Sequence, residues 1–196
     1  MNKDLALRLD QVESHLAIQQ LAVRYALAVD SRDIESWLQL FAPDVDCGSY
    51  GKGREALRRS IVPGLRSFYR SIHLVCGHSI DFDGPNSATG KVYCRAEHED
   101  GPKWVVVPLL YHDSYVRQDG RWYFARRSDR SWYSADVLDR PGSEGLQTWQ
   151  PLAGRDPALP RTFDTWAGFW DAAAPGTVEA LTSFPVPSPK RQGPDK

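Results

Sequence analysis

Two consecutive stretches decide the fold: SIHLVCGHSIDFDG at 71–84 and SATGKVYCRAEHE at 87–99. In both, residue character alternates with a period of two, which is typical of β-strands. The sequence Asp83-Gly84-Pro85-Asn86 supplies turn chemistry between them. The pattern therefore predicts an antiparallel hairpin with strands at about 72–83 and 88–98.

The same alternation continues on the C-terminal side of this hairpin, at 104–117 and 121–135. The turns Asp100-Gly101-Pro102 and Asp119-Gly120 separate these runs. Four long strands in succession predict a meander, and 44–50 reads as a short extra strand. No helix alternates with these strands, so a parallel α/β fold is disfavoured.

Helical patterns precede the strands. Residues 4–31 read as a helix broken once, Asp33 as the N-cap of a short helix that Pro43 stops, and 54–70 as a helix kinked or split by Pro63. Segregated helices and strands predict an α+β fold, in which a curved antiparallel sheet wraps over the N-terminal helices.

Composition changes beyond about residue 135. We expect one domain, with the curved sheet, at 1–135 and an extension at 136–196, which comprises a Gly- and Pro-rich loop, an aromatic helix at about 161–173 and a disordered tail at about 185–196. Phe163, Trp166, Phe169 and Trp170 carry the aromatic pattern. We expect this extension to fold against the open end of that domain or against a neighbouring subunit.

Charge and cysteine content limit the function. Lys and Arg number 24 against 25 Asp and Glu among 196 residues, so electrostatics does not favour a nucleic-acid or anionic-membrane partner. No uncharged run reaches 18 residues, and three cysteines without a CxxC pair fit reduced thiols in a cytoplasmic protein. We expect no membrane span and a small neutral ligand.

A pair of histidines is the sharpest local prediction. If the turn is centred near residue 85, His73 lies opposite His98, on the inward face with Val92, Cys94 and Ala96. The alternative is a hydrogen-bonded core His73 and a solvated His98 at a strand end, and a β-bulge would shift the register.

Asp30 ends an otherwise apolar helical face, where a carboxylate is costly to bury without a partner. A nearby histidine would supply one, or Asp30 turns to water at the helix end. His73 and His78 are five residues apart. This odd number places their side chains on opposite faces of a regular strand and argues against a metal site. No phosphate-binding glycine loop, hydrolase elbow or zincin motif occurs.

Three stretches together resemble the SnoaL-like branch of the NTF2-like superfamily: VRYALAVDSRDIESWLQLFAPDV (23–45), the strand pair at 71–99, and LLYHDSYVRQDGRWYFARRS (109–128). The resemblance implies a cone-shaped, cystatin-like fold. It also implies that Asp30 and His73 form a dyad in which His73 is the general base and Asp30 holds its tautomer.

The resemblance implies roles for further residues. Tyr25 and Tyr50 match tyrosines that polarise a substrate carbonyl, and His98 matches a second histidine that handles the leaving hydroxyl. An arginine of the last strand, one of Arg126, Arg127 and Arg130, is also expected. The expected substrate pocket consists of Trp37, Phe41, Val92, Cys94, Ala96 and Arg127.

The function that follows is a cofactor-independent lyase, with a dehydratase-type β-elimination on a hydrophobic cyclic or polycyclic carbonyl compound. An isomerase or polyketide-type cyclase with the same base is the alternative, and a non-catalytic binding or assembly module is a third. The resemblance also implies a homo-oligomer, dimer or trimer. We expect no metal and no cofactor.

Overall fold

The computed structural model describes residues 3–139, 149–152, 154–156 and 158–177. The tail expected at 185–196 lies outside the described residues. The elements are α1 (Lys3–Asp30), α2 (Ile34–Leu38), η1 (Gly48–Tyr50), α3 (Arg54–Leu65), β1 (Ser71–Gly84), β2 (Ser87–Asp100), β3 (Lys103–Gln118), β4 (Arg121–Ser131), β5 (Ala135–Asp136), η2 (Gln150–Leu152) and α4 (Asp164–Asp171).

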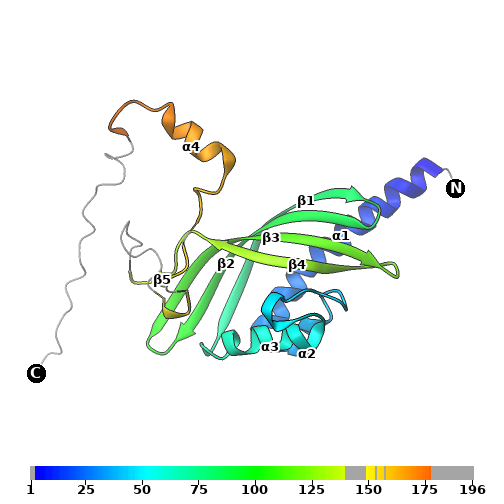
Figure 1. Cartoon of the computed structure of the whole chain (residues 1–196), viewed down its shortest axis with the longest axis horizontal. Coiled ribbons are helices and arrows are strands. Elements are labelled where there is room, and N and C mark those ends of the chain that lie inside the picture. Colours follow the sequence, from blue (N-terminus) through cyan, green and yellow to red (C-terminus); the bar gives the residue numbers. More distant parts are fainter. Residues whose placement is uncertain (1–2, 140–148, 153, 157, 178–196) are drawn as a thin grey trace, which may run out of the picture.

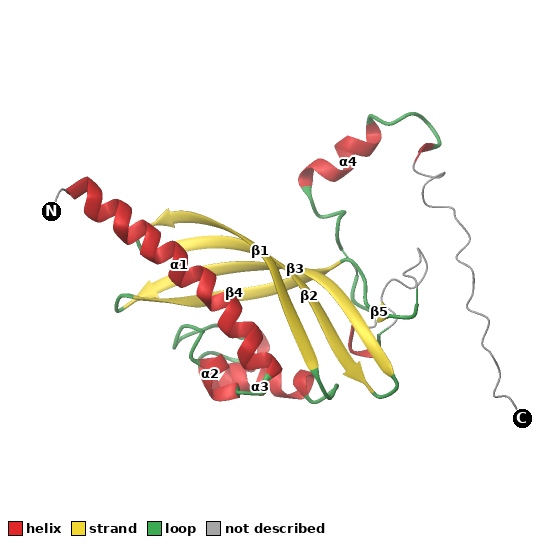
Figure 2. Ribbon diagram, turned by 180° about the vertical axis from the view of Figure 1, so that it is seen from behind, coloured by secondary structure: helices red, strands yellow, loops and turns green. Residues whose placement is uncertain are grey.

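The strands form one antiparallel sheet in the order β1-β2-β3-β4, and the short β5 pairs with β3. The sheet is long and curved, and α1 runs across its inner face (Figures 1 and 2). Helices α2 and α3 pack beside the C-terminal end of α1. The predicted α+β class and curved meander are confirmed.

The helices differ in detail from the sequence prediction. α1 is continuous, because Lys3–Asp30 contains neither glycine nor proline. Asp33 caps α2 as predicted, its Oδ1 accepting the Ser36 N–H at 3.0 Å. α3 ends at Leu65 instead of residue 70, two residues beyond Pro63.

The short strand predicted at 44–50 is wrong. Its last three residues, Gly48–Tyr50, form the 3₁₀-helix η1, and its strand-like pairing is limited to an isolated bridge between Asp46 and Lys52. Gly48 and Gly51 have φ of 60° and 94°, in the left-handed region that turns the chain and ends an extended segment.

Two β-bulges in β1 correct the predicted register. Val75 pairs with Cys94 but Gly77 pairs with Tyr93, and Phe82 pairs with Ala88 but Gly84 pairs with Ser87, so Cys76 and Asp83 are each an extra residue on β1. His73 therefore lies opposite Ala96, not opposite His98.

The bulge at Cys76 also changes which side chains of β1 face inward. His78 lies opposite the fully buried Val92, so it shares the inner face with His73. The expectation that these histidines lie on opposite faces is wrong for this reason. A strand with one extra residue shifts its inward positions from odd to even numbers.

The extension lies partly on the sheet and partly away from it. Trp149 is buried in a cluster with Val92, Cys94 and Ala96. By contrast, α4 stands apart from the sheet in both views and has no buried residue (Figures 1 and 2). Within the extension, Trp149, Pro151 and Leu152 line a cavity of the domain, whereas α4 does not. That the extension folds against the mouth of the cone or a neighbouring subunit stays a prediction.

Within the described ranges, no helix combines the length and the apolar character that a membrane crossing needs.

Candidate functional site

The end of α1 positions the first functional side chain. Arg32 N–H bonds Val29 O at 3.1 Å and Asp33 N–H bonds Ala28 O at 2.9 Å, which is the Schellman pattern. Arg32 takes the left-handed conformation that this motif requires, with φ of 60°. The helix therefore stops one turn after Ala26, with Asp30 in its last turn facing β1.

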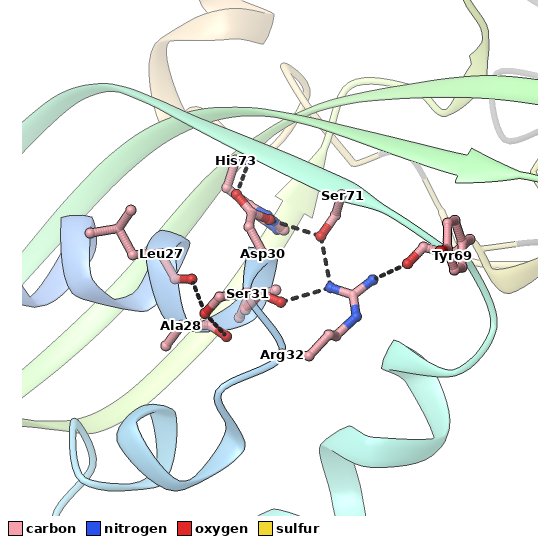
Figure 3. Close-up of polar contacts among 9 residues, drawn as sticks. Leu27, Ala28, Asp30, Ser31, Arg32, Tyr69, Ser71 and His73 are labelled. Atoms are coloured by element: carbon pink, nitrogen blue, oxygen red, sulfur yellow. Dashed lines mark hydrogen bonds and ion pairs between the residues drawn. The ribbon is translucent and has the colours of Figure 1, made fainter.

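Asp30 binds the start of β1 at two points. One carboxylate oxygen, Oδ1, lies 2.7 Å from His73 Nδ1, and Oδ2 accepts the His73 backbone N–H at 2.8 Å (Figure 3). An ionised carboxylate only accepts hydrogen bonds, so the geometry assigns the proton to Nδ1. Nε2 of His73 is then the basic nitrogen.

Ser71 and Arg32 support this pair. Ser71 Oγ donates to Asp30 Oδ1 at 2.8 Å, and Arg32 Nη1 donates to Ser71 Oγ at 3.0 Å (Figure 3). Arg32 also bonds the carbonyl oxygens of Val29 and Tyr69, at 2.7 and 3.0 Å. Burial raises the pKa of Asp30, but the hydrogen bonds from His73 and Ser71 outweigh it and leave that pKa below its ordinary value.

His98 lies beside this pair in an aromatic environment. The centre of its ring is 5.9 Å from the centre of the His73 ring, because the two residues are diagonal neighbours across β1 and β2. Phe68 and Trp149 each lie 4.5 Å from the His98 ring. Burial, together with the neighbouring His73, lowers the pKa of His98 to about 4, so His98 is neutral at neutral pH.

A cavity of about 290 Å³ opens at the two histidines. We call it the His73 cavity. Its polar lining comes from Tyr25, Ser67, His73, His98 and Arg155, and its apolar lining from Val29, Ile61, Leu65, Phe68, Trp149, Pro151 and Leu152. A small apolar cavity with a few converging polar groups is the usual form of a small-molecule site.

Tyr25 connects the cavity to a buried ion pair. Its ring contacts that of His73 at 6.4 Å, and the guanidinium of Arg127 lies 4.4 Å from its centre. Arg127 forms two hydrogen bonds with Asp113, at 2.9 and 2.7 Å. Burial raises the pKa of Tyr25, which keeps its hydroxyl a neutral donor.

Hydrogen bonds connect the Arg127–Asp113 pair through Tyr115 to His78. Asp113 Oδ2 accepts the Tyr115 hydroxyl at 2.8 Å, and that hydroxyl lies 2.9 Å from His78 Nε2. Of the three arginines considered for the last strand, Arg127 is therefore the one whose side chain is buried on the inner face.

The structure brings Asp30, His73, His98 and Tyr25 together but leaves Tyr50 elsewhere. Tyr50 lies on η1, is about half exposed, and does not line the His73 cavity. The residues expected to form the pocket are in the core instead: Trp37, Phe41, Val92, Cys94 and Ala96 are each at most 4% exposed and are absent from the cavity lining. Ala96 nevertheless faces His73 across the strand pair.

Sequence reasoning missed several contributors. Trp149 belongs to the extension, and only its aromatic character hinted at packing. Ser71 and Arg32 are ordinary polar residues whose roles depend on contacts between α1 and β1. Asp113 is the acid of the buried Arg127–Asp113 pair. In the sequence, only the alternation of the strand indicates that its side chain faces inward.

In the described part of the chain, no group of three or more His, Cys, Asp or Glu side chains is placed to hold a metal ion.

The structure is thus that of a cone-shaped α+β protein with a partly buried acid–histidine pair at an apolar cavity. The comparison with protein families agrees. Residues 10–128 match the model of the SnoaL-like domain, and the chain belongs to that family.

Relatives and similar structures support the same placement. The chain is 28% identical over 125 residues to the uncharacterized protein Rv2910c of Mycobacterium tuberculosis, covering 60% of this chain and 84% of that protein. It resembles hexachlorocyclohexane dehydrochlorinase LinA-type3 from Novosphingobium barchaimii, with 22% identity, a TM-score of 0.60, and coverage of 68% and 96%.

Another similar structure is a candidate scytalone dehydratase from Novosphingobium aromaticivorans. Its identity is 24%, its TM-score is 0.57, and the match covers 67% of this chain and 92% of that one. At these identities, the two structures establish the fold that this chain shares with them.

Proposed function

We propose that this protein is a cofactor-independent lyase that removes water from a hydrophobic cyclic or polycyclic carbonyl compound. The observation that carries the proposal is the 2.7 Å contact between Asp30 Oδ1 and His73 Nδ1 at the edge of an apolar cavity. The dehydratase and the dehydrochlorinase among the similar structures are named for eliminations.

The first step is proton abstraction. His73 Nε2 takes a proton from the carbon next to the substrate carbonyl, and Asp30 stabilises the imidazolium that forms. Asp30 is suited to this because hydrogen bonds keep its pKa low and its charge in place. A positioned acid or base contributes about 10²–10⁴-fold to such a reaction.

The second step is loss of the hydroxyl group. Tyr25 donates a hydrogen bond to the enolate oxygen, and the C–O bond breaks as the double bond forms. Because the pKa of His98 is about 4, this neutral residue is a hydrogen-bond donor to the leaving oxygen. The imidazolium of His73 supplies the proton, so water leaves and the base is restored. Because Tyr50 lies outside the cavity, Tyr25 is the one of the two tyrosines that can donate a hydrogen bond to the enolate oxygen.

One observation favours a second candidate. A histidine with so low a pKa is a poor cationic acid, and a reaction without a leaving group does not need one. An isomerase or cyclase that uses His73 to take and return a proton therefore remains the alternative.

A panel of cyclic β-hydroxy ketones tests the proposal. We expect the wild type to release water from a member of the panel, His73→Gln to be inactive, and His98→Gln to be strongly impaired. Proton exchange or double-bond migration without water loss, retained by His98→Gln, would favour the isomerase. Binding without any turnover would overturn both and indicate a binding module.

A further inference from the structure

The outer side of α1 carries an apolar stripe that the fold does not use. Leu5, Leu9, Val12, Leu16 and Val23 are between 41 and 57% exposed. The residues of α1 that pack on the sheet, such as Ile18 and Leu21, lie on the opposite side of the helix. In Figure 2, α1 runs along the near side of the molecule, and no described element covers this side.

The spacing of the stripe is that of a coiled-coil seam. Its members follow one another at intervals of four, three, four and seven residues, which places Leu9, Leu16 and Val23 at a positions and Leu5 and Val12 at d positions of a heptad, with Gln19 at the next d position. From Leu5 to Val23 the seam covers 19 residues, or about 28 Å of helix at 1.5 Å per residue. A soluble surface rarely exposes so many large apolar side chains in one row.

Charges beside the stripe specify the partner. With Leu9 and Leu16 at a positions, Arg8 stands at a g position and Glu13 at the following e position. In a parallel pair of identical helices, Arg8 of one chain meets Glu13 of the other, twice by symmetry. Within the described residues neither side chain has an ion-pair partner, although Asp10 on the same helix pairs with Arg117.

The N-terminal part of α1 also needs support. It projects beyond the end of the sheet (Figure 1), so its leucines have little of this chain to pack on. Isolated helical segments of this length are marginal in water unless an apolar face is buried.

We propose that α1 pairs with α1 of a second copy of this chain, as a parallel, two-stranded coiled coil along Leu5, Leu9, Val12, Leu16 and Val23. From α1 the His73 cavity takes Tyr25 and Val29, which lie on the side of the helix away from this seam, so the pairing leaves the site of each copy open.

Sedimentation equilibrium of the full chain tests this pairing. We expect a dimer, and we expect Leu9→Glu to weaken dimerisation at least tenfold. Leu7→Glu is the matched control, because Leu7 is even more exposed but lies outside the stripe. Circular dichroism spectra would verify that both variants keep their helix content.

A charge exchange tests orientation. Arg8→Glu and Glu13→Arg should each weaken the dimer, and the double variant should restore it. A monomeric wild type would overturn the pairing. This holds even if the monomer binds vesicles of neutral lipid instead. A dimer that Leu9→Glu leaves unchanged, or charge variants whose combination gives no rescue, would overturn it too.

Discussion

Asp30 and His73 show how a few hydrogen bonds give a histidine a defined chemistry. The carboxylate holds Nδ1, and the Schellman turn at Arg32 holds the carboxylate. The orientation therefore depends on local backbone geometry at one helix end. Asp30 is retained in a partly buried position because Ser71 and the His73 amide also bind it.

Asp30→Asn is the sharpest substitution at this scale. An amide can donate to Nδ1, which moves the ring proton to Nε2 and removes the base. We expect the turnover number to fall by about 10²–10⁴-fold with little change in stability. Steady-state kinetics would measure it. Asp33→Asn is the control, since Asn also caps helices and Asp33 lies outside the cavity; an equal loss in both variants would contradict the assignment.

Trp149 controls the environment of His98. Trp149→Ala should admit water to the ring and raise the pKa of His98 from about 4 toward its ordinary value of 6.5. An NMR titration of the ring protons would measure this. Trp132→Ala removes a tryptophan that stacks on Tyr93, away from the cavity, and should leave the titration unchanged. An unshifted His98 in Trp149→Ala would show that the tryptophan does not exclude water.

At the scale of elements, the hairpin of β1 and β2 sets the site. Its strands could be predicted from alternation and turn residues, whereas its register could not, because nothing in the local pattern marks Cys76 and Asp83 as bulged residues. The two histidines still approach each other, since residues two positions apart remain diagonal neighbours on one face.

The residues that line the cavity could not be predicted from the sequence either. Patterning identifies Trp37, Val92 and Cys94 as inward, but only tertiary packing decides which inward residues fill the core and which line a cavity. The side chains that close the cavity come from Phe68 and Trp149, 81 residues apart in sequence. Sequence periodicity carries no information on such a contact.

Gly90 on β2 leaves no room for a Cβ atom. A Cβ at this position would lie 2.8 Å from Ser79 O and 3.0 Å from Tyr115 Cε2. Gly90→Ala should therefore lower the free energy of unfolding by about 1–3 kcal/mol. Gly77→Ala is the control, because a Cβ there meets nothing within 4 Å. Chemical denaturation would compare the two, and equal stabilities would contradict the close packing.

At the scale of the whole molecule, two inward histidines make stability depend on pH. Burial lowers the pKa of His78 and of His98 to about 4, below the ordinary 6.5. Between these values the unfolded chain binds more protons than the folded one. The free energy of unfolding should therefore fall as the pH drops from 6.5 to 4, by at most about 1.4 kcal/mol per pH unit for each histidine.

Denaturation at several pH values would measure this slope. His98→Gln should reduce it, because one of the contributing histidines is gone. A slope that His98→Gln leaves unchanged would show that His98 does not contribute to it.

The proposed function requires that His73, oriented by Asp30, removes a proton next to a carbonyl group. The most direct measurement is exchange of that proton in D₂O, followed by NMR on a cyclic β-hydroxy ketone that the protein binds. The wild type should exchange or eliminate, and His73→Gln, which keeps the cavity but lacks the base, should do neither. Equal exchange by the wild type and His73→Gln would contradict the claim.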